Sequence, residues 1–483
     1  SYATGSTDAG LSGATGTFTA ISPTADELDE NPLRAGMLYR DGDFAWKLAP
    51  SAEEPGVPFF PVGDTQWSFA EEFFGPGTSH PDEWTPWMQA RRRHGFTSFL
   101  GTVWVGLYDR AQKAFPGESF GLPGDPLREP RPTYFRRLDR MVAAANRRGI
   151  LMGLMVGSFP DNADWFGRWR TRRRHLKWID YLVARYQAFD VRWTLFGEVN
   201  ENGGRPTSMP GGWIEDDPDR IVDWPEEVRV TARRIRKKDA YNHPIGSQHV
   251  RVDRTSVENP DIDYVEVQAD SPGNRSENQY DQLRAYRQWE KPLWIEEYWY
   301  EDSRGAARSE HDPGSAIYVE GWQRGIRNTH RNFVHALAFP TMGSLMRAHF
   351  PYVDPSSVAE DPGARAMGFF ADFYRGLEMR RFAPCDSLVH STASNDTNRR
   401  PLCGRFGDDY ALFLQGNEST VQLDLGDLPA DSRYSVERMQ IYDGDVVPLA
   451  EVCSGGVRTI AKGTSADMVA VRVRRIDGRS CAS

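Results

Sequence analysis

The stretch Trp193-Thr194-Leu195-Phe196-Gly197-Glu198-Val199-Asn200 predicts a short buried strand that ends in a carboxylate. Its large apolar residues are typical of a strand covered on both faces, and Gly197 allows the backbone to turn. Because side chains alternate along a strand, Thr194, Phe196 and Glu198 are expected to share a face. Parallel α/β folds carry their chemistry at the carboxyl ends of such strands, so Glu198 is the first candidate catalytic residue.

A second carboxylate ends the run KPLWIEEYW at residues 291–299. With regular alternation, Leu293, Ile295 and Glu297 share one face of this strand and Glu296 lies on the other. If Leu293 and Ile295 fill the interior of a barrel, Glu297 points into its mouth, whereas Glu296 turns towards the helices or the rim. The sequence therefore predicts two carboxylates that face each other across the mouth.

Strand-like runs alternate with amphipathic helices through the first three quarters of the chain. Besides the opening stretch, the predicted strands are residues 59–63, 96–104, 150–156, 244–249, 263–268, 293–297 and 333–339. The predicted helices are residues 81–94, 134–148, 173–189, 228–236 and 279–289. Such alternation indicates parallel βαβ units, and eight of them fit a (β/α)8 TIM barrel. A doubly wound sheet is the alternative, but no Gly-rich phosphate loop follows the first strand.

The pattern of apolar and polar residues changes after a predicted closing helix at residues 362–382. Short alternating runs then recur every ten or so residues, which indicates a C-terminal antiparallel β-sandwich. The predicted runs are residues 410–414, 420–425, 434–438 and 468–473. We therefore predict an N-terminal arm, partly irregular and loose to about residue 30, over residues 1–38. The barrel with its closing helix follows over 39–384 and the sandwich over 385–483.

The four cysteines all lie in the predicted sandwich, and none has the spacing of a metal site. They are Cys385, Cys403, Cys453 and Cys481. An even number in one small β-rich region favours two disulfides and an exported protein, with four buried free thiols as the alternative. The start of the chain has no apolar signal-peptide core. We therefore expect a secreted or cell-surface protein whose signal peptide is absent from this chain.

The net charge of −10 argues against nucleic acid or an anionic membrane as the main partner. The sequence contains no run of eighteen or more apolar residues, so no transmembrane helix is predicted. The arginine-rich segments 91–94 and 170–175 are expected to be solvated faces of helices. Fifteen tryptophans fit either a large aromatic core or rings that stack on sugars. No metal-binding or cofactor motif is present, so neither is predicted, and the oligomeric state stays open.

Two carboxyl groups across a barrel mouth suit the hydrolysis of a glycosidic bond. One protonates the leaving oxygen while the other attacks the anomeric carbon, and a retaining mechanism requires them about 5–5.5 Å apart. Neighbouring positions at the strand ends are predicted to bind a carbohydrate substrate. They are Asp64, Trp67, Trp104, Asn200, His249, Gln268, Tyr298 and Trp299.

The two glutamate segments resemble the motifs of clan A glycoside hydrolases. Residues 193–200 are similar to the acid/base string at the end of strand four, and residues 291–299 to the strand-seven string Lys-Pro-x-x-x-x-Glu. This resemblance implies that Glu198 is the acid/base and Glu297 the nucleophile. The clan usually has an Asn before its acid/base that holds the sugar 2-hydroxyl, and Gly197 stands there instead.

This departure fits a narrower resemblance. The string Gly63-Asp64-Thr65-Gln66-Trp67, the Gly before the acid/base and a β-rich domain after a closing helix are similar to the apiosidase-like glycoside hydrolases. In that family a clan A barrel carries a collagen-binding-type C-terminal sandwich. The resemblance covers residues 39–476 and implies a retaining hydrolase of a poly- or oligosaccharide.

Three alternatives stay open at this stage. Glu201 competes with Glu198 as acid/base because Asn200-Glu201 spells the clan's Asn-Glu dipeptide, although the apolar run ends just before Glu198. A transglycosylase would use the same two carboxylates. A carbohydrate-binding protein without activity, built on a decayed barrel, is the third. The sequence does not identify the sugar, its ring size, its anomeric configuration or the choice between endo and exo cleavage.

Overall fold

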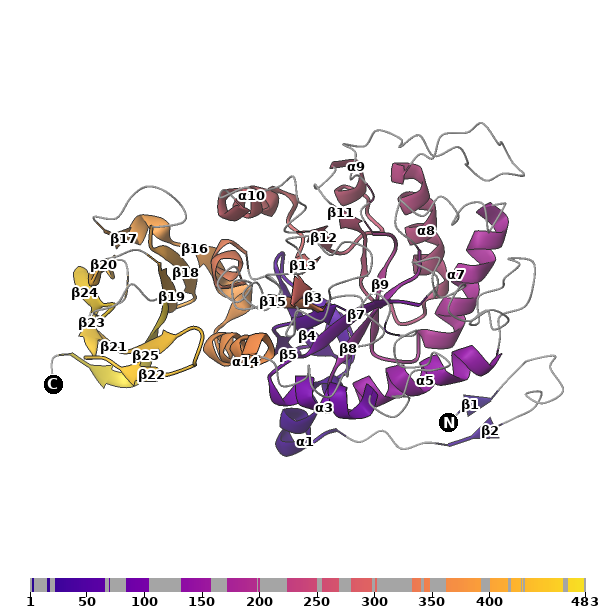
Figure 1. Cartoon of the computed structure of the whole chain (residues 1–483), viewed down its shortest axis with the longest axis horizontal. Helices are drawn as coiled ribbons and strands as arrows, with labels where there is room; N and C mark the ends of the chain where they lie inside the picture. The colour runs from indigo at the N-terminus through magenta and orange to yellow at the C-terminus, as the bar shows by residue number, and fades with distance from the viewer. Residues whose placement is uncertain are drawn as a thin grey trace, which may run out of the picture.

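The computed structural model describes residues 2–3, 15–17, 22–65, 69, 84–103, 132–157, 172–197, 199, 224–249, 254–268, 279–297, 300–301, 332–339, 343–347, 362–391, 400–415, 418–426, 428, 431–463 and 468–481. Figure 1 shows a mixed α/β part at one end and a β-rich C-terminal part at the other, with helix α14 (Pro362–Tyr374) between them. A two-stranded ribbon, β1 (Tyr2–Ala3) with β2 (Thr15–Gly16), lies at the edge of the mixed part.

The parallel strands form two sheets whose order follows the chain. The first has the order β10-β9-β8-β7-β6-β15-β14 and the second β11-β12-β13. Their bounds are β6 (Val62–Thr65), β7 (Ser98–Thr102), β8 (Leu151–Met155), β9 (Val191–Thr194), β10 (Ile245–Gly246), β11 (Gln248–His249), β12 (Val265–Gln268), β13 (Leu293–Glu297), β14 (Tyr300–Glu301) and β15 (Gly343–Arg347). Only Ser247 separates β10 from β11, and β15 returns to the side of β6. The prediction of parallel βαβ units is confirmed.

Helices alternate with these strands and cover one face of them. They are α3 (Trp84–Arg93), α5 (Pro132–Asn146), α7 (Arg172–Tyr186), α8 (Trp224–Lys238), α9 (Arg254–Val257) and α10 (Gln279–Tyr286), the last continued by a 3-10 turn (Arg287–Trp289). Trp193 of β9 shares a core cluster with Ile179 and Leu182 of α7. Leu293 and Ile295 of β13 share another with Tyr280 of α10. These side chains define the outer face of the strands.

The eighth strand differs from its prediction. Residues 332–338 are helical, and the strand that pairs with β6 is β15. Phe333, Ala336 and Leu337 are buried in one cluster, at the spacing of a helix face. A short apolar run does not distinguish a buried strand from a buried helix, and the strand predicted at residues 333–339 was wrong for this reason. The first strand is also later than predicted, because Phe59 ends a separate strand and β6 begins at Val62.

An antiparallel meander precedes the first parallel strand. It comprises β3 (Met37–Asp41), β4 (Ala45–Ala49) and β5 (Val57–Phe59). Trp46 of β4 packs edge-on against Trp294 and Tyr264, with ring centroids 5.5 and 5.8 Å apart. The loose arm was overstated, because α1 (Ala25–Glu30) is a helix whose N-terminus is closed by a capping box at Thr24.

The arginine-rich helix segments are not uniformly solvated, contrary to the prediction. Arg93 is exposed, but Arg91 is 1% exposed and lies over the rings of Trp87 and Phe96. His175 is fully buried in the second segment. Each segment occupies a helix that packs on the strands, so one residue in every turn is carried into the core.

The C-terminal part forms two antiparallel sheets around one core. The first has the order β16 (Phe382–Pro384), β18 (Leu402–Phe406), β19 (Asp409–Leu414), β25 (Val469–Ser480), β21 (Ser432–Gln440) and β22 (Val446–Pro448), with β23 (Val452–Cys453) beside β21. The second has the order β17 (Val389–His390), β20 (Thr420–Asp424) and β24 (Val457–Ala461). Leu412 of the first sheet and Leu423 and Ile460 of the second lie in the same cluster.

The cysteines form two disulfides in this part, Cys385–Cys403 and Cys453–Cys481. The prediction of two disulfides is confirmed, and the alternative of four free thiols is wrong.

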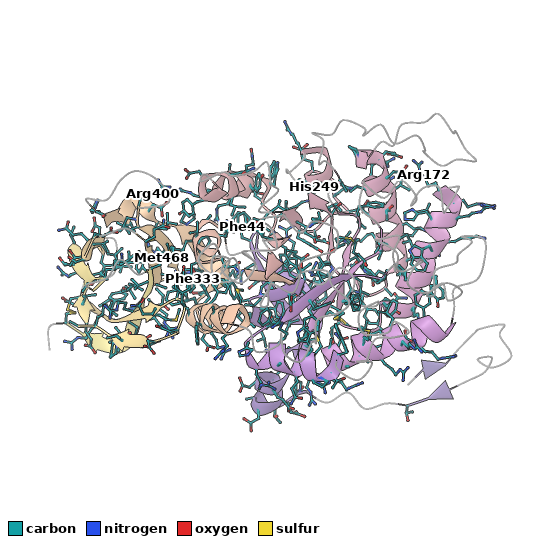
Figure 2. The ribbon with its side chains drawn as sticks, in the orientation of Figure 1. Phe44, Arg172, His249, Phe333, Arg400 and Met468 are labelled. Atoms are coloured by element: carbon teal, nitrogen blue, oxygen red, sulfur yellow. A yellow bond between two sulfur atoms is a disulfide. The ribbon has the colours of Figure 1, made fainter. Side chains whose placement is uncertain are left out.

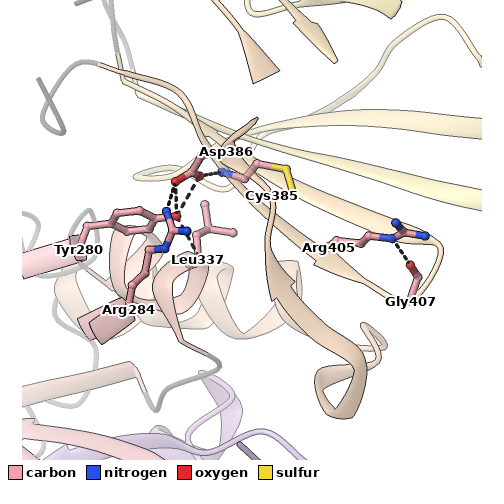
Figure 3. Close-up of a disulfide and its surroundings, with 8 residues drawn as sticks. Tyr280, Arg284, Leu337, Cys385, Asp386, Arg405 and Gly407 are labelled. Carbon is pink, nitrogen blue, oxygen red and sulfur yellow. Dashed lines mark hydrogen bonds and ion pairs between the residues drawn. A yellow bond between two sulfur atoms is a disulfide. The ribbon is translucent and has the colours of Figure 1, made fainter. Parts of the chain in front are cut away.

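Asp386 fastens the C-terminal sheets to the mixed part, as Figure 3 shows. The Tyr280 hydroxyl and the Arg284 guanidinium of α10 donate to its Oδ2 at 2.7 and 3.0 Å. The Cys403 N–H donates to its Oδ1 at 2.9 Å. Cys403 is disulfide-bonded to Cys385, the residue before Asp386, so the crosslink also holds the docking carboxylate. Figure 2 shows Phe333 at the same junction, where it stacks on Phe413 of β19.

Candidate active site

A buried ion pair lies at the inner face of the parallel strands. Arg192 of β9 is 0% exposed, and its Nη2 pairs with the Glu296 carboxylate of β13. Its Nη1 donates to the Tyr264 hydroxyl at 2.9 Å, and its guanidinium lies 3.8 Å from the Trp294 ring centroid. Arg192 and Glu296 therefore meet across the interior from strands that are not neighbours.

Glu296 is thus placed opposite to its prediction. The sequence assigned Leu293 and Ile295 to the interior and Glu296 to the helices or the rim. The structure has Leu293 and Ile295 in the helix-facing cluster and Glu296 inside, paired with Arg192. The physical reason is that a charge buried in the interior requires an opposite charge there, and two apolar side chains would leave Arg192 without one.

A glycine makes room for the guanidinium. A Cβ at Gly153 of β8 would lie 2.6 Å from Nη2 of Arg192. A Cβ at Gly246 of β10 would likewise lie 2.3 Å from the Tyr264 ring. Both contacts are shorter than real Cβ contacts, so a side chain at either of these inner-face positions would require the Arg192 guanidinium or the Tyr264 ring to shift.

We expect Gly153→Ala to lower the free energy of unfolding by about 1–3 kcal/mol, because the new methyl group overpacks the site of Arg192. Urea unfolding at neutral pH measures the change. An unfolding free energy equal to that of the wild type would contradict the crowding around this guanidinium.

Glu266 of β12 adds a second carboxylate to the interior. The Thr194 hydroxyl donates to its Oε2 at 3.1 Å and accepts from Arg192 at 3.2 Å. Burial raises the pKa of Glu266 to about 7, although the charge of Arg192 and the hydrogen bond from Thr194 lower it. Glu266 therefore changes charge near neutral pH.

The backbone on either side of Glu198 is hydrogen-bonded to Gln248 of β11. The Gln248 N–H donates to the Phe196 carbonyl at 3.0 Å, and the Val199 N–H donates to the Gln248 carbonyl at 3.2 Å. Phe196 packs against His175 of α7, with ring centroids 6.0 Å apart. The prediction that Phe196 shares a face with Thr194 is therefore wrong, because regular alternation ends where β9 ends.

Strand β13 carries a β-bulge beside its last residue. Val267 of β12 pairs with Ile295, but Gln268, the next residue of β12, pairs with Glu297. Glu296 is thus an extra residue on the β13 side of the ladder. Bulges are rare between parallel strands, and bulges in general are over-represented at the rims of barrels and next to active sites, where they change the direction of a side chain.

Asp64 and Thr65 of the Gly-Asp-Thr string make buried contacts on opposite faces of β6. Asp64 of β6 accepts from Arg91 of α3 at 2.5 Å, and each side chain is 1% exposed. Asp64 was predicted to bind substrate, and its carboxylate instead links the strand to a helix. Thr65 faces the interior, where its hydroxyl donates to the Glu296 carbonyl at 2.7 Å. Sequence reasoning missed Thr65, although it lies in the quoted string.

On the fifth predicted strand, the pairing of β11 with β12 places Gln248 on the inner face, and not His249, which was predicted to bind substrate. Gln248 pairs with Glu266, and His249 pairs with Val267. Val267 belongs to the helix-facing cluster, so His249 occupies an outer position at the strand end. Figure 2 labels His249, which is the last residue of β11. Both residues are buried. The alternation of side chains along the strand could have indicated Gln248, because it lies two residues after Gly246 of the inner face.

The remaining predicted site residues are outside the part of the chain that the structure describes. They are Trp67, Trp104, Glu198, Asn200, Tyr298 and Trp299, together with the rival Glu201 and the side chains of Gln268 and Glu297. Their assignments stay predictions. Among the described residues, no group of three or more His, Cys, Asp or Glu side chains is arranged to hold a metal ion. Over the same ranges, no helix combines the length and apolarity needed to cross a membrane.

A match to a known protein family shows where the chain belongs. The family described as "Apiosidase-like, catalytic domain" matches residues 52–320, which is more than half of the chain. The chain belongs to the apiosidase-like family. The sequence resemblance is confirmed, and the chain is a glycoside hydrolase. An inactive carbohydrate-binding protein is thereby set aside. No curated protein matches this apiosidase-like chain.

Solved structures share the fold of this apiosidase-like protein. A glycoside hydrolase family 5 protein from Bacteroides vulgatus is similar with a TM-score of 0.68 and 17% identity, over 94% of each chain. A structure described as a glycoside hydrolase has a TM-score of 0.68 and 14% identity, over 94% of this chain and 99% of the other. At these identities the likeness concerns the fold alone, a mixed α/β part with a β-rich C-terminal part.

The carboxylate of Glu266 predicts a pH dependence of stability. Its folded pKa of about 7 lies above the ordinary value of 4.5, so its neutral form favours folding. That contribution is full below about pH 4.5 and is lost as the pH rises through 7, for a total of about 3 kcal/mol at roughly 1.4 kcal/mol per unit. We expect Glu266→Gln, which stays neutral, to gain stability relative to the wild type between pH 5 and pH 8.

Urea unfolding at the two pH values measures this gain. Glu258→Gln, at an exposed glutamate after α9, is the control and should differ from the wild type equally at both pH values. Equal pH dependences for Glu266→Gln and the wild type would contradict the assignment.

Proposed function

We propose that this glycoside hydrolase cleaves O-glycosidic bonds of a poly- or oligosaccharide with retention, with Glu198 as acid/base and Glu297 as nucleophile. The observation that carries the proposal is the register of β13, which pairs Glu297 with Gln268 at the carboxyl end of β12. Gln268 lies two residues after the inner-face Glu266, so alternation supports an inner position for this pair. The anchoring of Phe196 and Val199 supports a defined place for Glu198 between them.

The proposal includes a closed (β/α)8 barrel. Support comes from the parallel pairing of β15 with both β14 and β6, which returns the last strand to the first. The chain links β10 to β11 and β13 to β14 at the two places where the sheets are separate. In this arrangement the fourth and seventh strands bring their carboxyl ends to one mouth. The two C-terminal sheets would form a sandwich domain from about residue 385.

The chemistry follows from two carboxyl groups at one glycosidic bond. In the first step Glu198 gives its proton to the glycosidic oxygen while Glu297 forms a bond to the anomeric carbon, and the bond to the leaving group breaks. In the second step Glu198 takes a proton from water, the water oxygen attacks the same carbon, and the Glu297 carboxylate is released. Two inversions give net retention.

The substrate proposal is limited to its class. Residues Trp67, Trp104, Tyr298 and Trp299 are proposed to contact sugar rings, and Asn200 and Gln268 sugar hydroxyls. Gly197 stands where the wider clan has an Asn for the 2-hydroxyl, so recognition of that hydroxyl is assigned to another residue. The two disulfides support the proposal that the protein is secreted or on the cell surface, because such crosslinks persist in oxidising compartments.

We expect Glu297→Gln to lose hydrolysis by at least about a thousandfold, because a neutral amide forms no glycosyl intermediate. Glu198→Ala should lose turnover of natural linkages but keep that of 2,4-dinitrophenyl glycosides, since their leaving group needs no proton, and added azide should give the glycosyl azide. The assay is a panel of α- and β-linked 2,4-dinitrophenyl glycosides and of plant and bacterial polysaccharides.

Four results would contradict parts of the proposal. Full activity of Glu297→Gln would remove its nucleophile. Rescue by azide at Glu201→Ala, and not at Glu198→Ala, would transfer the acid/base role to Glu201. An inverted product, seen by proton NMR of the first-formed anomer, would exclude double displacement. Sugar transfer to an added acceptor in place of water would change the reaction to transglycosylation on the same two carboxylates.

A further inference from the structure

The bulge in β13 decides which face of the strand its last residue occupies. Ile295 lies on the outer face, so an unbroken strand would return Glu297 to that face two residues later. The extra residue Glu296 shifts the alternation by one, and Glu297 pairs with Gln268 instead. The proposed nucleophile therefore depends on a backbone irregularity that the sequence pattern does not show.

Two contacts from other strands hold the residue at this bulge. The Thr65 hydroxyl of β6 donates to the Glu296 carbonyl at 2.7 Å, which fixes the backbone. The Arg192 guanidinium of β9 pairs with the Glu296 carboxylate, which fixes the side chain on the inner face. Thr65 and Arg192 are both 0% exposed. Glu296 is thus held by both its backbone and its side chain.

We propose that Thr65 and Arg192 are positioning residues, which hold the bulge at Glu296 and thereby direct Glu297 into the active site. The proposal rests on the proposed function, in which Glu297 is the nucleophile. Neither residue needs to touch the sugar. Thr65 acts through the carbonyl, and Arg192 through the carboxylate, of the residue that precedes the reacting group. This role explains why a charged pair occupies an interior that apolar side chains would otherwise fill.

The first test is a matched pair of substitutions at Thr65. Thr65→Val keeps the shape of the side chain and removes the donor, whereas Thr65→Ser keeps the donor. Because a misplacement of about 1 Å costs about a hundredfold in rate, we expect Thr65→Val to lower kcat by about 10- to 100-fold with KM within about twofold. Thr65→Ser should stay within about threefold of wild-type kcat. The probe is the 2,4-dinitrophenyl glycoside that the wild type cleaves fastest.

Thr97→Val is the control for a purely structural effect. The Thr97 hydroxyl also donates to a backbone carbonyl, that of Phe60 at 3.2 Å, but at the amino ends of the strands. We expect this variant to lose stability and to keep its kcat. A loss of kcat in Thr97→Val equal to that in Thr65→Val, at matched stability, would overturn the positioning role.

The second test concerns the ion pair. Arg192→Met alone leaves the Glu296 carboxylate buried without its cation, so the substitution is combined with Glu296→Gln, which gives a neutral pair of similar volume. The double variant should unfold cooperatively in urea and show the same fall in kcat as Thr65→Val. If it does not fold, the Thr65 pair decides the question by itself.

The outcomes separate this inference from the function on which it rests. Wild-type activity of Glu297→Gln would refute the nucleophile assignment, and the positioning role would fall with it. An inactive Glu297→Gln together with wild-type kcat in Thr65→Val, or in the folded double variant, would refute the positioning role alone and leave the function in place.

Discussion

The ion pair between Arg192 and Glu296 is the constraint on which the mixed α/β part depends. Both side chains are at most 1% exposed, so each must find opposite charge and hydrogen bonds inside the protein. The ring of Trp294 and the hydroxyls of Tyr264 and Thr194 supply these contacts. The pair joins the strand before Glu198 to the strand that ends at Glu297, so the two predicted catalytic segments share one buried link.

The surrounding elements are arranged to accommodate this polar interior. Gly153 and Gly246 leave space where any side chain would collide with Arg192 or Tyr264. Trp46, from the meander before the parallel strands, packs against Trp294 and Tyr264 from another direction. The helices meanwhile pack on the apolar outer face. The described inner face of these strands therefore combines charged, hydroxyl and aromatic side chains, whereas the outer face is apolar.

The C-terminal sheets are coupled to the mixed part through specific contacts. Asp386 accepts from Tyr280 and Arg284 of α10, and the Cys385–Cys403 disulfide lies directly beside it. Phe333 stacks on Phe413 across the same junction. Because α10 precedes β13 in the chain, the helix that bears this contact leads into the strand with the bulge. The C-terminal part thus contacts the helix that leads into β13.

The sequence by itself determined the family and the alternation of parallel strands with helices, because this alternation and local motifs are written in neighbouring residues. The two catalytic glutamates stay predictions from the same motifs. The sequence also predicted two disulfides from four clustered cysteines. Only the tertiary structure decided which face each strand turns inward. Alternation assigns residues to two faces but does not say which face is inside, and a bulge shifts it without a signal in the pattern. Asp64 pairs with Arg91, and Glu296 with Arg192, because a buried charge requires an opposite charge close to it. The Thr65 hydroxyl donates to the Glu296 carbonyl. In each case the partner lies far along the chain, where the sequence pattern does not indicate it.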